Sequence, residues 1–144
     1  MLIRQAELKD RQEILNIVHG LYLDIPRFVW NTEDFVTKQI ENKEYFVVEH
    51  EGVLAGVVSL RRRSSKVSIE TLAVRKDLQF KGFGTKLIEF AKQFTKEQGF
   101  TILHAYSFKE YGIGDFYIKK GFKVMGDVGY YQNHTYDCFE MELS

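Results

Sequence analysis

A strand, a glycine-containing turn and a helix follow one another over residues 67–98, and this order constrains the fold more than any other feature. Residues 67–74 form a β-rich run, and a stripe at helical spacing follows the turn: Leu87, Ile88, Ala91 and Phe94. A second β-rich run occupies residues 101–106. Strand, helix and strand in this order are typical of a right-handed βαβ crossover, so we expect the two strands to be parallel neighbours.

The turn contains Gly82 and Gly84, spaced Gly-x-Gly. Such glycines let backbone N–H groups approach an anion, and the following helix directs the positive end of its dipole toward the same point. A glycine pair alone is equally an ordinary turn. A Walker A motif requires Gly-Lys followed by Ser or Thr, whereas Gly84 is followed by Thr85 and Lys86. A Rossmann fingerprint requires a third glycine where Leu87 stands, so both nucleotide motifs are excluded.

The remaining elements indicate a mixed sheet. We expect a strand at 2–6, a helix from Asp10 to before Pro26 with Asp10 and Glu13 as its capping box, and a second helix at 32–42. Further runs predict a hairpin from 45–48 and 53–60, a helix at 110–120, and strands at 122–125 and 136–143. The predicted fold is α/β (α+β), one domain over residues 1–144, with a mixed central sheet of about six to seven strands and about four helices.

Composition narrows the classes of partner. Lysine plus arginine equals aspartate plus glutamate, at 20 each, which disfavours nucleic acid, and no apolar run reaches the ~20 residues that span a bilayer. Cys138 is the only cysteine and agrees with a reducing compartment, so we expect a cytoplasmic protein without a membrane partner. The four histidines lack metal-ligand spacing, and we expect no metal.

Two further segments each have two readings. The charged run at 61–66 is interpreted as a solvated turn rather than an anion site. The aromatic segment at 24–31, which holds Pro26 and Trp30, is either a loop folded onto the core or a substrate-facing wall.

Three stretches together resemble the GCN5-related N-acetyltransferase (GNAT) family: residues 69–74, the glycine turn, and Phe116-Tyr117 followed by Gly121-Phe122. The resemblance implies acetyl-CoA as cosubstrate. It implies that backbone groups of Leu72, Ala73 and Val74 pair with the pantetheine arm. The phosphates would be bound by N–H groups of the turn, which comprises Gln79, Phe80, Lys81, Gly82, Phe83, Gly84 and Thr85.

The chain departs from the family pattern at Glu110 and Ile113, where the family often has an asparagine and a small residue. Gly112 and Gly114 also fall inside the helix expected at 110–120. Both departures put in question where this helix starts and whether it contacts the cofactor.

The resemblance implies roles for two side chains. Tyr117 matches the general acid that protonates the leaving thiolate, against the alternative of a core aromatic residue. Strand alternation places Glu70, Leu72 and Val74 on one face, where a carboxylate among apolar neighbours would have a raised pKa and act as a base through water. The alternative for Glu70 is a solvent-exposed position, or a strand bulge that changes its facing. The oxyanion donor would be a backbone N–H of residues 72–74.

The acceptor is expected to be a primary amine, a small molecule or an amino acid derivative. A faint likeness of Tyr130-Tyr131 and of residues 137–141 to ribosomal-protein N-terminal acetyltransferases leaves a peptide amine open. A non-catalytic acetyl-CoA-binding sensor domain is the rival from another class. A homodimer also stays open.

Overall fold

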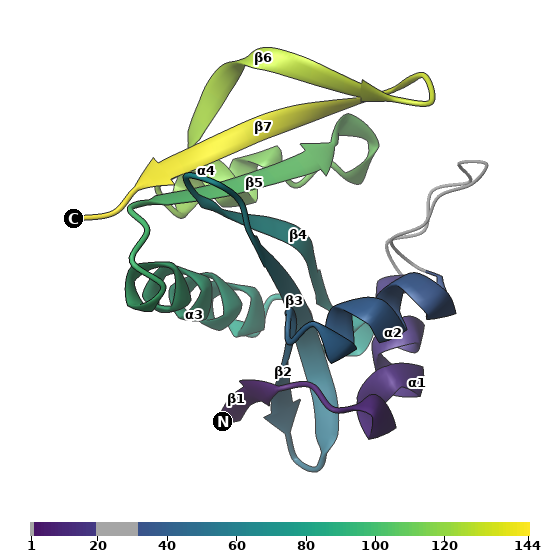
Figure 1. The fold of residues 1–144 in the computed structure, drawn as a ribbon. Coiled ribbons are helices and arrows are strands. Elements are labelled where there is room, and N and C mark those ends of the chain that lie inside the picture. Colours follow the sequence, from purple (N-terminus) through teal and green to yellow (C-terminus); the bar gives the residue numbers. More distant parts are fainter. Residues whose placement is uncertain (1, 20–31) are drawn as a thin grey trace.

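The computed structural model describes residues 2–19 and 32–144, which form a seven-stranded mixed sheet with helices on both faces (Figure 1). The strand order is β1-β2-β3-β4-β5-β7-β6. This confirms the predicted fold class and strand number. The strands are β1 (Leu2–Gln5), β2 (Tyr45–His50), β3 (Val53–Arg62), β4 (Val67–Val74), β5 (Ile102–Phe108), β6 (Lys123–Tyr131) and β7 (His134–Glu142).

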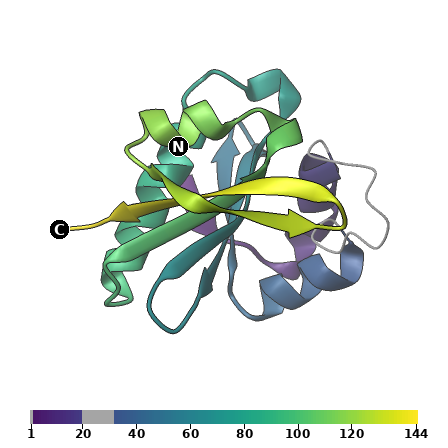
Figure 2. The same ribbon diagram turned by 90° about the horizontal axis from the view of Figure 1, so that it is seen from above.

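All neighbouring strands are antiparallel except β4 and β5. These two pair in parallel and are joined through helix α3 (Phe83–Glu97), which confirms the predicted βαβ crossover. The predicted β2–β3 hairpin is also present. Because the sheet is strongly twisted, the β6–β7 hairpin runs across the N-terminal strands when the molecule is seen from above (Figure 2).

Helices α1 (Arg11–Val18) and α2 (Glu33–Glu41) lie on one side of the sheet and α3 on the other (Figure 1). The first pair covers a core that includes Ile14, Val36 and Val57. Helix α4 (Gly114–Lys119) belongs with α3, because Tyr117 shares a second core with Leu87 and Ile88. The sheet is therefore a wall between two apolar layers.

The first turns of the N-terminal helices are stabilised in different ways. Thr32 caps α2 by accepting a hydrogen bond from the Phe35 N–H at 3.3 Å. The predicted capping box of Asp10 and Glu13 is wrong. The Asp10 carboxylate instead accepts from the Glu7 N–H, at 2.8 Å, and the Glu13 carboxylate accepts from the Leu54 N–H.

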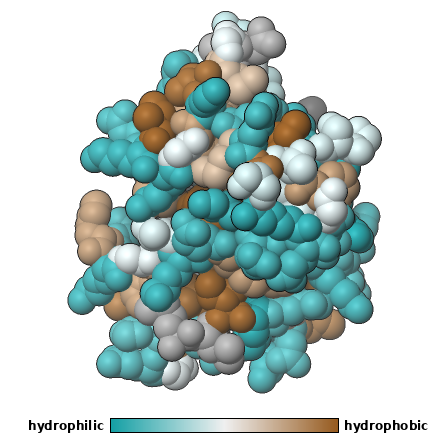
Figure 3. All heavy atoms as spheres, turned by 90° about the vertical axis from the view of Figure 1, so that its left-hand side faces the viewer, coloured by the Kyte–Doolittle hydropathy of each residue, from teal (hydrophilic) through white to brown (hydrophobic). Residues whose placement is uncertain are grey.

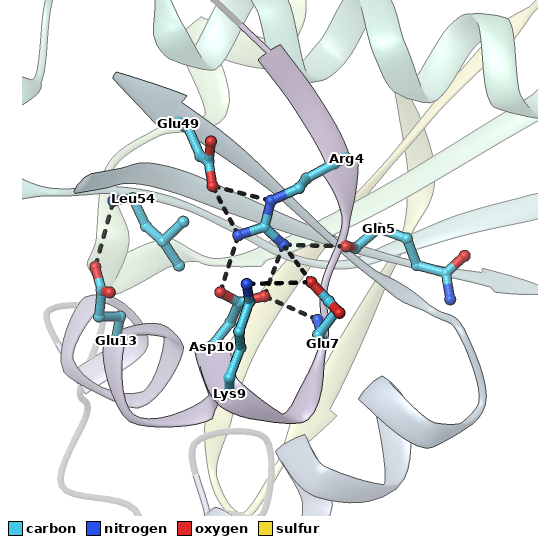
Figure 4. Close-up of polar contacts among 8 residues, drawn as sticks. All are labelled: Arg4, Gln5, Glu7, Lys9, Asp10, Glu13, Glu49 and Leu54. Carbon is cyan, nitrogen blue, oxygen red and sulfur yellow. Dashed lines mark hydrogen bonds and ion pairs between the residues drawn. The ribbon is translucent and has the colours of Figure 1, made fainter. Parts of the chain in front are cut away.

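Asp10 is only 5% exposed and forms an ion pair with Arg4 (Figure 4). The guanidinium donates to both Asp10 oxygens, at 2.7 and 2.9 Å, and to Glu49 on β2, at 2.8 and 2.9 Å. These contacts hold β1, the start of α1 and β2 together. Arg4 holds the pKa of Asp10 below its ordinary value, mainly through these hydrogen bonds.

The predicted helix at 110–120 is wrong in its start. Residues Lys109–Tyr111 form a short 3-10 turn, and α4 begins at Gly114. Gly112 has φ +66°, a left-handed conformation that a right-handed α-helix cannot contain. Gly112 therefore separates the 3-10 turn from α4.

Pro26, Trp30 and the rest of the aromatic segment at 24–31 lie outside the described residues. On the side of the molecule at the left of Figure 1, hydrophilic residues cover most of the surface and the apolar ones are scattered (Figure 3). No helix within 2–19 or 32–144 has the length and apolar character required to cross a membrane.

The Arg4–Asp10 pair predicts a pH-dependent stability. Replacing Asp10 by asparagine should lower the free energy of unfolding at pH 7 by about 1–3 kcal/mol, because charged hydrogen bonds are lost. A carboxyl group whose pKa is lower in the folded state than in the unfolded state stabilises the fold at pH values above its unfolded-state pKa. This stabilisation is lost as the pH falls through the folded-state pKa. The difference between wild type and Asp10→Asn should therefore shrink below about pH 4 in urea titrations.

The matched control is Asp77→Asn. Asp77 also pairs with an arginine, Arg75, at 2.8 Å, but its side chain is 63% exposed. Such a pair contributes little, so this variant should lie within about 0.5 kcal/mol of wild type. An equal decrease in the free energy of unfolding in the two variants would contradict the prediction that the buried Arg4–Asp10 pair stabilises the fold more than the exposed pair.

Candidate active site

Strands β4 and β5 pair only over a short stretch, in which residues 67–69 of β4 lie opposite residues 103–105 of β5. Beyond that point β4 continues beside β3 and β5 continues beside β7, so the two strands separate. A pocket of about 270 Å³ lies there. It is lined by residues from both faces of the sheet: Val18, Arg63, Glu70, Thr71, Leu72, Tyr106, Ser107, Phe108, Tyr111, Ile113, Tyr117, Tyr131 and Tyr136.

Glu70 is the extra residue of a β-bulge in β4. Thr71 lies opposite Ser59 and Ile69 lies opposite Leu60, which leaves Glu70 without a partner on β3. The predicted shared face of Glu70, Leu72 and Val74 is therefore wrong, because the bulge interrupts the alternation. Leu72 and Val74 pack against the core under α3, whereas Glu70 meets Arg61, whose guanidinium lies over the Phe35 ring of α2.

The Glu70 side chain is 1% exposed, so the solvent-exposed alternative is excluded. One carboxylate oxygen accepts from Arg63 at 2.6 Å and lies 3.7 Å from Arg61. The other accepts from the Tyr106 hydroxyl. Burial raises the pKa of Glu70, and the two arginines act against this increase. The direction agrees with the sequence-based expectation, although the neighbours are charged and aromatic rather than aliphatic.

Tyr117 reaches the same pocket from α4. Its ring stacks on Phe139, with centroids 5.1 Å apart, and meets Phe122 edge-on at 5.4 Å. The residue is 2% exposed, and burial raises the pKa of its phenol well above the ordinary value. Tyr117 is thus both a core residue and a pocket residue, with a hydroxyl that stays protonated at neutral pH.

The glycine turn ends in the first turn of α3. Gly82 is the N-cap residue, with φ +90°, and Phe83 anchors the turn by burying its ring. Gln79, Phe80 and Lys81 are exposed. The first turn of α3 has neither a side-chain cap nor an acidic residue. Its initial N–H groups therefore remain available to an anion.

Gly84 lies at a close approach between α3 and α4. A Cβ at this position would lie 3.2 Å from Cζ of Phe116, on the helix that carries Tyr117. The helix whose start departs from the predicted pattern thus packs directly against the glycine turn. This contact ties the position of Tyr117 to that of the turn.

Leu72, Ala73 and Val74 form the end of β4. On one side they pair with residues 56–58 of β3, and beyond Ile69 β4 has no pairing with β5. The Gln79 side-chain amide donates to the Val74 carbonyl at 3.3 Å and so connects the strand end to the turn. Val74 and Gln79 also line a second hollow of about 580 Å³ beside α1, with Asn16 and Lys76.

Two residues that line the pocket, Arg63 and Tyr106, were not predicted as site residues, nor was Arg61, which contacts Glu70 without lining the pocket. The two arginines were expected in a solvated turn, whereas both contact Glu70. Tyr106, which donates to Glu70, was expected only as a strand residue. The available signal was the spacing of the two arginines, which places them on one face at the end of a strand. No group of three or more His, Cys, Asp or Glu in the described ranges could hold a metal ion.

Comparisons with known proteins agree with this geometry. The model of the acetyltransferase (GNAT) family matches residues 15–122. No curated protein sequence matches the chain.

Several solved structures share the fold. Ard1 from Thermoplasma volcanium has a TM-score of 0.85 at 16% identity, covering 99% of this chain and 97% of that one. PaiA N-acetyltransferase from Thermoplasma acidophilum, in complex with coenzyme A, has a TM-score of 0.80 at 18% identity and 98% coverage of both chains. The ribosomal-protein-S18-alanine N-acetyltransferase from Escherichia coli has 0.80 at 18% identity, covering 99% and 94%. The match of the family model over most of the chain shows that it belongs to the acetyltransferase (GNAT) family.

Proposed function

We propose that the protein transfers an acetyl group from acetyl-CoA to a primary amine by direct attack of the amine on the thioester. The observation that carries this proposal is the position of Glu70 and Tyr117. Both line the one pocket that lies where β4 and β5 separate, and Phe116, next to Tyr117, packs against the glycine turn. A proton acceptor, a proton donor and an anion-binding turn are therefore joined in one region.

The residues present fit the donor substrate. The uncapped N–H groups at the start of α3 suit the diphosphate, which needs no basic side chain when main-chain amides and a helix dipole face it. The edge of β4 over Leu72, Ala73 and Val74 can pair with the amides of the pantetheine arm as an added strand would. The arm would then lead the thioester toward Tyr117.

The chemistry assigned to the side chains is a proton transfer at each end of the reaction. Glu70 takes a proton from the acceptor ammonium, directly or through water, and the neutral nitrogen attacks the thioester carbonyl carbon. A backbone N–H of Leu72, Ala73 or Val74 stabilises the oxyanion. When the carbon–sulfur bond breaks, Tyr117 gives its proton to the thiolate. The attacking nitrogen loses its extra proton to solvent as the amide forms. The products are therefore the N-acetylated amine, the free thiol and one proton, and the proton on Glu70 returns through solvent to Tyr117.

Burial acts on both groups. A carboxylate whose pKa is raised is a better base, and a phenol whose pKa is raised stays protonated at neutral pH but gives up its proton less readily. The Tyr106 hydroxyl and Arg63 hold Glu70 in place.

A protein N-terminal acetyltransferase is a second candidate, because one structure with the same fold is a ribosomal-protein-S18-alanine N-acetyltransferase. A non-catalytic acetyl-CoA sensor is a third. The buried carboxylate and phenol in one pocket favour an enzyme over a sensor.

The first prediction concerns donor binding. Acetyl-CoA should raise the melting temperature of the protein, and Gly82→Glu should abolish this shift. The glutamate places a negative charge beside the diphosphate. It also adds a side chain at a position with φ +90°, a backbone conformation that favours glycine. Thermal melts with and without acetyl-CoA measure the effect.

The control is Gly99→Glu. Gly99 also has a positive φ, +84°, and open space around its Cα, but it lies beyond the opposite end of α3. This variant should lose stability yet keep the shift. A Gly82→Glu protein that still responds to acetyl-CoA as the wild type does would contradict the assignment of the turn.

The second prediction concerns the reaction itself. Thiol release from acetyl-CoA, measured across small amines, amino acids, polyamines and N-terminal peptides, should reveal turnover with at least one class. With that acceptor, Tyr117→Phe should lower kcat by roughly 10²–10⁴-fold, which is the usual contribution of a general acid. The KM for acetyl-CoA should change little.

Tyr130→Phe is the matched control, because Tyr130 is 74% exposed and does not line the pocket. It should keep the wild-type kcat. No thiol release with any class would favour the sensor, and release only with peptides would favour the N-terminal acetyltransferase.

A further inference from the structure

Among the 13 described residues that line the pocket, one is acidic, Glu70, and one is basic, Arg63. Arg61 also contacts Glu70, but it is held by other groups. Its guanidinium lies 3.3 Å from the Glu44 carboxylate and 5.8 Å from the centre of the Phe35 ring. Arg63 is therefore the cation that faces the pocket.

Arg63 and Glu70 differ in exposure. The Glu70 side chain is 1% exposed, whereas that of Arg63 is 46% exposed, although the two meet at 2.6 Å. The Arg63 main chain is fixed by a hydrogen bond from its N–H to the Lys66 carbonyl at 2.8 Å. A side chain that is half exposed on a fixed main chain can exchange one carboxylate for another without a change in the fold.

We infer that the acceptor is an amino acid with an aromatic or bulky apolar side chain, and that Arg63 binds its carboxylate while Glu70 receives its ammonium. This inference rests on the proposed function and identifies the class of acceptor. A zwitterion matches the pair of opposite charges in the pocket. Arginine binds carboxylates through two parallel hydrogen bonds, which fixes the orientation of the ligand.

The exchange couples acceptor binding to the activation of Glu70. In the free protein Arg63 occupies one carboxylate oxygen of Glu70 and Tyr106 occupies the other. An arginine beside a carboxylate lowers its affinity for protons. When the carboxylate of the acceptor takes Arg63, the occupied oxygen of Glu70 becomes available to the ammonium. An amine without a carboxylate can displace Arg63 from Glu70, but it offers the guanidinium no anion in exchange.

The remaining walls suit an aromatic or bulky apolar group. The pocket is lined by aromatic rings at Tyr106, Phe108, Tyr111, Tyr117, Tyr131 and Tyr136. Among the described residues, the lining offers no second carboxylate for the far end of a polyamine.

The experiment compares amino acids with the amines that lack the carboxylate. Thiol release from acetyl-CoA is measured with L-phenylalanine and phenethylamine, and with L-leucine and isopentylamine. Wild type should prefer the amino acid in kcat/KM by roughly 10- to 100-fold, as expected for a charged, bidentate contact. In Arg63→Gln the ratio of kcat/KM for the amino acid to that for the amine should fall to about one. In Arg63→Lys the ratio should lie between those of wild type and Arg63→Gln, because lysine keeps the positive charge but cannot form two parallel hydrogen bonds.

Arg62→Gln is the matched control, because Arg62 donates to Gln98 at 2.9 Å and does not line the pocket. It should keep the wild-type ratio. A ratio near one in wild type, or an unchanged ratio in Arg63→Gln, would overturn the inference while leaving the acetyltransferase function intact. Turnover with peptides and with neither amino acid would do the same.

A binding measurement covers the case of no turnover with any acceptor, which would contradict the proposed function. Isothermal calorimetry of L-phenylalanine and phenethylamine with the CoA-loaded protein then tests the pocket alone. Tighter binding of L-phenylalanine that is lost in Arg63→Gln supports the role of Arg63. Equal binding of the two ligands, or binding of neither, overturns it.

Discussion

Strands β4 and β5 are hydrogen-bonded neighbours for only three residues each and then separate. Buried or partly buried backbone groups need partners, so a strand that loses its neighbour in the middle of a sheet leaves an edge that a ligand can complete. The same separation makes room for the pocket, whose walls come from both faces of the sheet. The free edge of β4 and the pocket thus depend on one irregularity in strand pairing.

Two contacts support this irregularity. Phe116 packs so closely against Gly84 that a Cβ there would lie only 3.2 Å from its ring, and Tyr117 stacks on Phe139 of β7. Helix α4 is thereby fixed between the glycine turn and the C-terminal hairpin. On the other face the β-bulge turns Glu70 toward Arg61 and Arg63, where its charge is paired although the side chain is buried. Each proposed catalytic group is therefore held by packing that also shapes the pocket.

The sequence predicts the regular parts of this molecule well. Hydrophobic periodicity and the glycine turn identify the sheet, the hairpin and the βαβ crossover, because these depend on local patterns. The errors fall where tertiary contacts override local spacing. Glu70 lies on the other face of the sheet because β4 has one extra residue relative to β3. The Asp10 carboxylate accepts hydrogen bonds from Arg4 and from the Glu7 N–H instead of capping α1. The role of Arg63 depends on a contact across the β3–β4 turn, which a run of charges cannot reveal.

The central claim is that the separation of β4 and β5 leads the thioester of acetyl-CoA to Tyr117. A crystal structure of the protein with coenzyme A tests it most directly. The diphosphate oxygens should lie about 3 Å from N–H groups at the start of α3, the pantetheine arm should run along Leu72, Ala73 and Val74, and the sulfur should lie beside the Tyr117 hydroxyl. Coenzyme A bound in the hollow beside α1, with its sulfur away from Tyr117, would contradict the account.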